Sequence, residues 1–237
     1  MKLNHDLHIE QRKSIWGLTL LLPVIFIGCI GDDIIFDEVE PVVRIVNPID
    51  SLALGSNYQF IYRYFDRTGQ EVDLAGGVWQ SDNPTSISIT TEGLATAEAA
   101  GSAIISVEIQ SEDGTNVQAE QLVHVGTTTT TSNHLRTGTL RTTSSYVLQG
   151  DFTAEQMGTS VLLSLNDNYE ASSNLPGLYL YLTNNPNSTN NALEVGAVET
   201  FKGAHSYEIE NVDVNDYSHL LYYCKPFRVK VGDGAFE

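Results

Sequence analysis

Residues 101–110 read GSAIISVEIQ, with Ala103, Ile105, Val107 and Ile109 at every second position. Side chains of a β-strand point alternately to its two faces, so this spacing predicts a strand with one buried face. Three further runs between residues 41 and 125 alternate in the same way. Their apolar or aromatic positions are Tyr58, Phe60, Tyr62, Tyr64, Ile87, Ile89, Val117, Ala119, Val123 and Val125.

Turn-forming residues separate these runs. Glycine, asparagine, aspartate and proline gather at residues 55–57, 66–69, 82–84 and 113–114. Such residues supply the positive or preset φ angles that tight reversals need. Because a sheet must bury its apolar face against another layer, several short strands at this spacing predict a small all-β domain, a β-sandwich, over residues 41–125.

Four segments of this region carry a family resemblance. They are residues 52–56 (LALGS), 78–83 (VWQSDN), 93–97 (GLATA) and 101–105 (GSAII). Their order and spacing resemble the bacterial immunoglobulin-like domain of group 2. The resemblance implies an immunoglobulin-like β-sandwich with Trp79 in its core. It also implies a spacer or adhesive role on a bacterial surface, without chemistry.

The N-terminal segment is typical of an exported lipoprotein. Basic residues precede an apolar run at 15–27, which is shorter than the roughly 20 residues that a membrane span needs. Residues 26–29 (FIGC) resemble a lipobox, in which the cysteine is acylated after cleavage. We expect a signal peptide over 1–28, lipid attachment at Cys29, and localisation in the bacterial cell envelope, at the outer membrane or cell surface. Residues 29–40 are then an acidic tether or a plain solvated spacer.

The charge balance limits the partners. Lys and Arg number 12 against 30 Asp and Glu, a formal net charge of -18. This charge opposes the phosphate backbone, so no nucleic-acid partner is expected. The expected partners are the membrane, through the lipid anchor, and a redox or surface protein.

A threonine-rich stretch follows the first β region. Gly126 precedes five threonines, and Ser132 and Asn133 continue the run. Such a low-complexity segment has little to bury, so residues 126–138 are predicted to be a linker. The alternative is a long final strand of the first domain.

The strand pattern then resumes over residues 139–237. The runs are residues 146–148, 160–165, 178–182, 206–209, 220–223 and 227–231. Asparagine-rich reversals at 165–168 and 184–187 separate some of them. The pattern predicts a second antiparallel β-sandwich or barrel-like domain.

Four segments of this second region resemble the DM-thirteen domain, which accompanies DOMON domains and is proposed to transfer electrons. They are residues 148–152 (LQGDF), 175–182 (LPGLYLYL), 201–209 (FKGAHSYEI) and 223–229 (YCKPFRV). The resemblance implies that Cys224 is the redox group, either as a naked thiol or as a ligand of a cofactor such as haem. Met157 stands where family members commonly have a histidine.

The cysteine count leads independently to Cys224. Acylation of Cys29 would leave Cys224 without a partner for an intrachain disulfide. Cys224 is then either an inert apolar residue of the core or a reactive thiol whose pKa is lowered by Lys225 and Arg228. His205 and His219 are candidate supporting bases or ligands, although a surface histidine is the alternative in each case.

Two registers are open for the segment around Cys224. Strict alternation over residues 222–231 places Phe227 and Val229 in the core and Cys224 on the other face with Arg228. A bulge at Pro226 would instead turn Cys224 inward.

Other chemistry is not indicated. The sequence has no His-x-x-x-His or Cys-x-x-Cys pair, phosphate-binding glycine loop or Gly-x-Ser-x-Gly elbow, so no metal site, catalytic residue or enzyme turnover is predicted. Two functions remain. One is a cell-envelope lipoprotein with an electron-transfer or ligand-binding module that uses Cys224. The other is a surface adhesion or scaffold protein in which Cys224 is structural.

Overall fold

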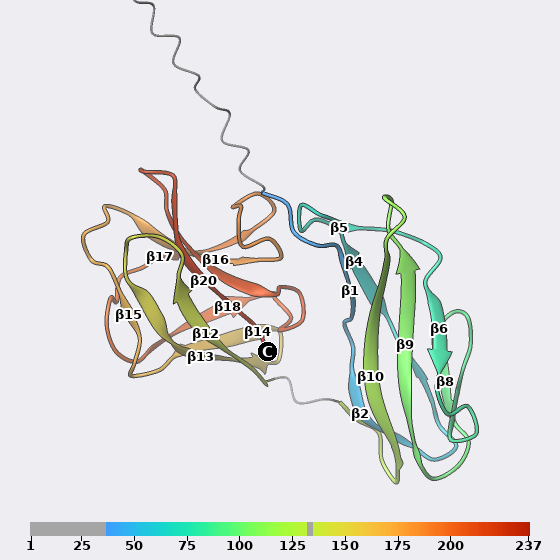
Figure 1. Cartoon of the computed structure of the whole chain (residues 1–237). Helices are drawn as coiled ribbons and strands as arrows, with labels where there is room; N and C mark the ends of the chain where they lie inside the picture. The colour runs from blue at the N-terminus through green and yellow to red at the C-terminus, as the bar shows by residue number, and fades with distance from the viewer. Residues whose placement is uncertain (1–36, 132–134) are drawn as a thin grey trace, which may run out of the picture. The chain divides into compact units, whose positions relative to one another are not determined.

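The computed structural model describes residues 37–131 and 135–237, and every regular element in these ranges is a β-strand (Figure 1). The predicted all-β fold is therefore confirmed. The described part of the chain contains no helix of the length and apolarity that a membrane crossing requires. The expected signal peptide and Cys29 lie outside the described residues.

The first region contains eleven strands in three sheets. The sheets have the orders β1-β4-β5, β11-β2-β10-β9-β6 and β3-β8-β7. The strands are β1 (Val42–Ile45), β2 (Ile49–Ala53), β3 (Asn57–Gln59), β4 (Tyr62–Phe65), β5 (Glu71–Val72), β6 (Val78–Ser81), β7 (Ile87–Ile89), β8 (Leu94–Ala97), β9 (Ser102–Gln110), β10 (Asn116–Gly126) and β11 (Thr130–Thr131). All pairs are antiparallel except β2 with β10.

Alternation along β9 forms part of the core of this region. Ala103, Ile105, Val107 and Ile109 are all buried, as their spacing predicts. Trp79 on β6 is also buried, with its ring centroid 5.8 Å from that of Phe60.

Strand β11 lies within the threonine-rich stretch. It pairs antiparallel with β2, and the Thr130 hydroxyl lies 2.8 Å from that of Ser51. Threonine is well suited to a strand because its branched side chain packs on the pleated surface. Part of residues 126–138 therefore has regular structure.

The second region is one nine-stranded, nearly closed, barrel-like sheet (Figure 1, yellow-green to red). Its order is β17-β16-β19-β20-β12-β13-β14-β18, and β15 pairs with β13. The strands are β12 (Leu135–Thr142), β13 (Leu148–Met157), β14 (Ser160–Leu165), β15 (Glu170–Ala171), β16 (Leu178–Thr183), β17 (Leu193–Ala197), β18 (His205–Glu210), β19 (His219–Cys224) and β20 (Val229–Ala235).

The ladders of this sheet define two ends. The Cys224 end holds the β19–β20 turn at residues 225–228, the β14–β15 turn at 166–169 and the start of β18. The opposite end holds the β18–β19 loop and Phe236.

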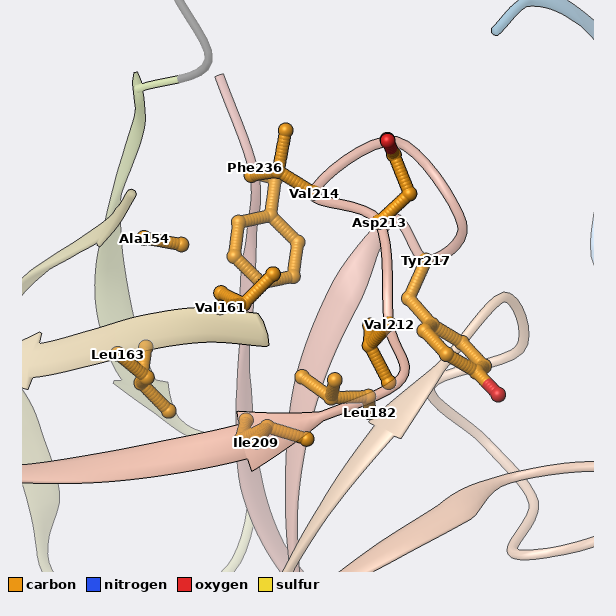
Figure 2. Close-up of a pocket in the computed structure, with 10 residues that line it drawn as sticks. All are labelled: Ala154, Val161, Leu163, Leu182, Ile209, Val212, Asp213, Val214, Tyr217 and Phe236. Carbon is orange, nitrogen blue, oxygen red and sulfur yellow. The ribbon is translucent and has the colours of Figure 1, made fainter. Parts of the chain in front are cut away.

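Figure 2 shows an apolar pocket at the end that holds Phe236. Its lining is Ala154, Val161, Leu163, Leu182, Ile209, Val212, Asp213, Val214, Tyr217 and Phe236. Most of these side chains are aliphatic, and none is a cysteine, histidine or methionine. The pocket is therefore a largely apolar extension of the core.

Candidate functional site

Cys224 is the last residue of β19 and is fully buried, with 0% of its surface exposed. Its strand partners are Leu178 on β16 and Val229 on β20. It is the free cysteine of the described residues and belongs to the apolar core of the second region. Its thiol is therefore closed to solvent.

The strictly alternating register over residues 222–231 is wrong. Strand β19 ends at Cys224, residues 225–228 form a turn, and β20 begins at Val229. Arg228 takes a left-handed φ of 54° in this turn, and Phe227 is 57% exposed rather than in the core. A hairpin, with a register shift between Tyr222 and Tyr223, turns Cys224 inward.

Lys225 is bound on the outside of the sheet. Its amide donates to the Gly177 carbonyl at 3.2 Å, and its Nζ lies 2.6 Å from a Glu194 carboxylate oxygen and 3.7 Å from the Tyr179 ring centroid. The hydrogen bond with Glu194 raises the pKa of Lys225. The ammonium is thus already paired with a carboxylate on β17.

The other two predicted supporting residues do not join Cys224 in one cluster. Arg228 is exposed in the turn. His219 begins β19, with its Nδ1 2.8 Å from the Ser218 hydroxyl, and burial lowers its pKa. At about 3.3 Å per residue, the five residue steps from His219 to Cys224 span roughly 17 Å. Met157 is exposed at the end of β13 away from Cys224.

A group of aromatic side chains lies next to Cys224 instead. Tyr222 is fully buried two residues earlier on the same inward face of β19, so the two Cα atoms are about 7 Å apart. The Tyr222 ring centroid lies 6.2 Å from that of Tyr169, which is 4.7 Å from that of His205. The His205 ring is in turn 5.4 Å from that of Tyr207. We call Tyr222, Tyr169, His205 and Tyr207 the aromatic ladder.

Three polar atoms of the ladder are buried and make no hydrogen bond of ordinary length and angle: the hydroxyls of Tyr169 and Tyr222, and Nε2 of His205. The two hydroxyls still lie close enough to influence each other's pKa. The His205 Nδ1 lies 2.9 Å from the Gly203 carbonyl oxygen. A carbonyl only accepts, so Nδ1 carries the proton and Nε2 of the neutral ring keeps a lone pair. The ladder therefore holds two phenol donors and one basic nitrogen.

Burial raises the pKa values of both buried phenols above the ordinary value of 10. For Tyr222 the neighbouring Tyr169 raises the pKa further, and the pKa ends well above 10. Charging a phenol out of contact with water is costly, so both tyrosines stay neutral at ordinary pH.

Local backbone contacts fix Tyr169 at this place. A Cβ on Gly150, which has a φ of +131°, would lie 2.6 Å from the Tyr169 Cα. Only a glycine allows this approach. The Tyr169 carbonyl also accepts from the Gly203 amide at 2.9 Å, and Asn168 donates to the Asp151 carboxylate at 2.8 Å. The segments at 148–152 and 201–209 thus meet around Tyr169.

Sequence reasoning named His205 only as a candidate ligand or base and did not single out Tyr169 or Tyr222. Tyr222 could have been found from the sequence, because it stands two residues before Cys224 in a predicted strand and therefore lies on the same face. Tyr169 lies in a turn, where no periodicity reports burial.

A haem bound through Cys224 does not fit this packing. The sulfur is enclosed in the core, where a macrocycle would have to displace buried side chains such as Leu178 and Val231. Among the described residues no group of three or more His, Cys, Asp or Glu could hold a metal ion. Cys224 is therefore a free thiol enclosed in the apolar core.

Comparison with known proteins is informative for the second region. Residues 139–236 match the protein family described as Electron transfer DM13. This match supports a DM13 domain over the barrel-like sheet. No curated protein matches the chain.

Proposed function

We propose, with residues 139–236 as a DM13 electron-transfer domain, that this chain is a cell-envelope lipoprotein that passes single electrons through Cys224. The observation that carries the proposal is the enclosure of the family's redox candidate in an apolar core beside a buried tyrosine. Cys29 would supply the lipid anchor, at about 0.8 kcal/mol per buried methylene. Residues 41–125 would act as an immunoglobulin-like spacer.

The burial of Cys224 favours one-electron chemistry over thiol–disulfide exchange. Exchange requires a thiolate to attack a partner's sulfur directly, and a fully buried sulfur cannot be attacked. An electron needs no such contact. Cys224 would lose one electron to a one-electron carrier protein and its S–H proton to a base, leaving a thiyl radical. A one-electron donor and a proton would restore the thiol.

Rapid oxidation tests this proposal. The purified protein is exposed to photochemically generated tris(bipyridine)ruthenium(III), frozen within milliseconds and examined by electron paramagnetic resonance. We expect a sulfur-centred radical in the wild type and none in Cys224→Ala. Identical spectra from the two proteins would contradict the proposal.

The adhesion alternative is supported by one feature of the first region. Ile104 and Leu122 are direct partners on β9 and β10 and are 38% and 50% exposed. Exposed apolar patches mark binding surfaces when they are large, and this pair is small. If adhesion is the function, Ile104→Lys abolishes cell-surface attachment whereas Cys224→Ala leaves it unchanged.

A further inference from the structure

We infer that the aromatic ladder is a radical relay between Cys224 and the edge strand β18. This inference rests on the proposed electron transfer and adds the internal route, the proton acceptor and the exit surface. Tyr222 and Tyr169 are the redox-active members, and His205 holds the proton that they release.

The geometry supplies a continuous route. Cys224 and Tyr222 are neighbours on one face of β19, and the successive ring centroids lie 6.2, 4.7 and 5.4 Å apart from Tyr222 to Tyr207. Tyr207 is half-buried on β18, so the ladder runs from the closed core to the edge of the sheet. Electron tunnelling weakens exponentially with distance, and closely spaced oxidisable rings divide one long step into short ones.

The polar atoms of the ladder fit proton-coupled oxidation. A buried phenol without a hydrogen-bond partner lowers stability, since it loses its hydration without compensation. The Tyr169 ring centroid lies 4.7 Å from that of His205, whose Nε2 has no hydrogen-bond partner, and 6.2 Å from that of Tyr222. Removal of an electron from a neutral tyrosine also requires removal of its proton, and His205, whose ring packs edge-on against that of Tyr169 with the centroids 4.7 Å apart, is the base beside it.

Oxidation of Cys224 through the ladder takes three steps. A one-electron oxidant at β18 takes an electron from Tyr169, whose phenolic proton passes to Nε2 of His205. The Tyr169 phenoxyl radical takes a hydrogen atom from the Tyr222 hydroxyl, and the Tyr222 radical takes one from the Cys224 thiol. The products are the reduced oxidant, a His205 imidazolium and a Cys224 thiyl radical, with both tyrosines restored.

The exit surface belongs to an edge strand. Strand β18 ends the sheet order and pairs along its length only with β14, while Ser206, Glu208 and Glu210 point outward. Edge strands leave backbone groups open to another molecule. Because these carboxylates and the chain as a whole are acidic, the oxidant that docks here should be a basic one-electron carrier.

The test uses the full-length protein and the ruthenium oxidant described above. We expect Tyr169→Phe and Tyr222→Phe each to lower the yield of the Cys224 radical at least tenfold. Phenylalanine keeps the ring but cannot form a phenoxyl radical. Tyr223→Phe is the matched control, because Tyr223 neighbours both Tyr222 and Cys224 in sequence and faces the other side of β19. Its yield should equal that of the wild type.

Two further measurements complete the test. Cys224→Ala should leave a phenoxyl radical in place of the sulfur radical, and near-ultraviolet circular dichroism confirms that each variant is folded. Wild-type radical yields in both phenylalanine variants would overturn the relay and leave the role of Cys224 intact. Absence of a sulfur radical from the wild type itself would overturn the proposed function.

Discussion

Cys224 sits in the core as a small, polarisable and fully buried side chain. Its position at the end of β19, between Leu178 and Val229, gives the thiol the surroundings of an aliphatic residue. Free cysteine tolerates such burial well. A more polar group of the same size would lower the stability of the folded protein at this position.

Substitutions at Cys224 should distinguish the loss of apolar packing from the burial of an added polar group. We expect Cys224→Ser to lower the free energy of unfolding by about 1–3 kcal/mol more than Cys224→Ala, because the buried hydroxyl would lack a partner. Urea unfolding of the two variants measures the difference. Equal stabilities would show that a polar partner reaches residue 224 in the folded protein.

The raised pKa of Tyr222 should make the free energy of unfolding depend on pH above pH 10. The pKa of Tyr222 is raised well above 10 in the folded chain, whereas an unfolded tyrosine ionises near 10. The stabilisation is therefore complete below pH 10 and is lost as the pH rises from 10 towards the folded pKa, because only the unfolded chain releases the proton there.

Tyr222→Phe removes this coupling between proton release and unfolding. Its free energy of unfolding should fall less steeply above pH 10 than that of the wild type, because phenylalanine has no proton to release. Chemical unfolding at several pH values provides the measurement. An equally steep fall of the free energy of unfolding in both proteins would contradict the raised pKa of Tyr222.

At the scale of elements, the turn that carries Tyr169 depends on close backbone packing against β13. We expect Gly150→Ala to destabilise the protein by more than the roughly 1–3 kcal/mol that a left-handed alanine costs, because its Cβ would meet the Tyr169 Cα. Gly196→Ala is the control. Gly196 has a similar φ of +151°, but a Cβ there meets nothing within 4 Å.

Thermal unfolding compares the two variants, and the Cys224 radical yield reports the position of Tyr169. A larger loss of stability in Gly196→Ala than in Gly150→Ala would show that contact with Tyr169 does not matter.

The elements also show what the sequence could predict. Strands with a strict period of two, such as β9, were found because one face is buried and the other exposed. The runs at 220–223 and 227–231 correspond to β19 and β20, but the turn between them was not identified, because it uses Arg228, not glycine or asparagine, at a positive φ. Of the candidate site, Cys224 was found from the cysteine count, whereas Tyr169 was not, since only three-dimensional packing against Gly150 brings it to the core.

At the scale of the whole molecule, charge should control the rate of electron exchange. The chain has a formal net charge of -18, and oppositely charged partners associate faster in such a field. We expect a cationic one-electron mediator to react faster than an anionic one of similar potential. Added salt should reduce the difference between the two reaction rates, because the Debye length falls to about 10 Å at 0.1 M.

Stopped-flow rate constants at low and high salt measure this effect. Equal rates for the two mediators at low salt would show that the field of the molecule does not reach the exchange site.

The open edge at β18 has a consequence for self-association. An unpaired strand invites a second copy to add to the sheet, and it could continue into fibrils. Glu208 and Glu210 stand outward along this strand, so two copies that approach edge to edge would bring like charges together. The carboxylates that would attract a basic partner should therefore also oppose edge-to-edge pairing of two copies.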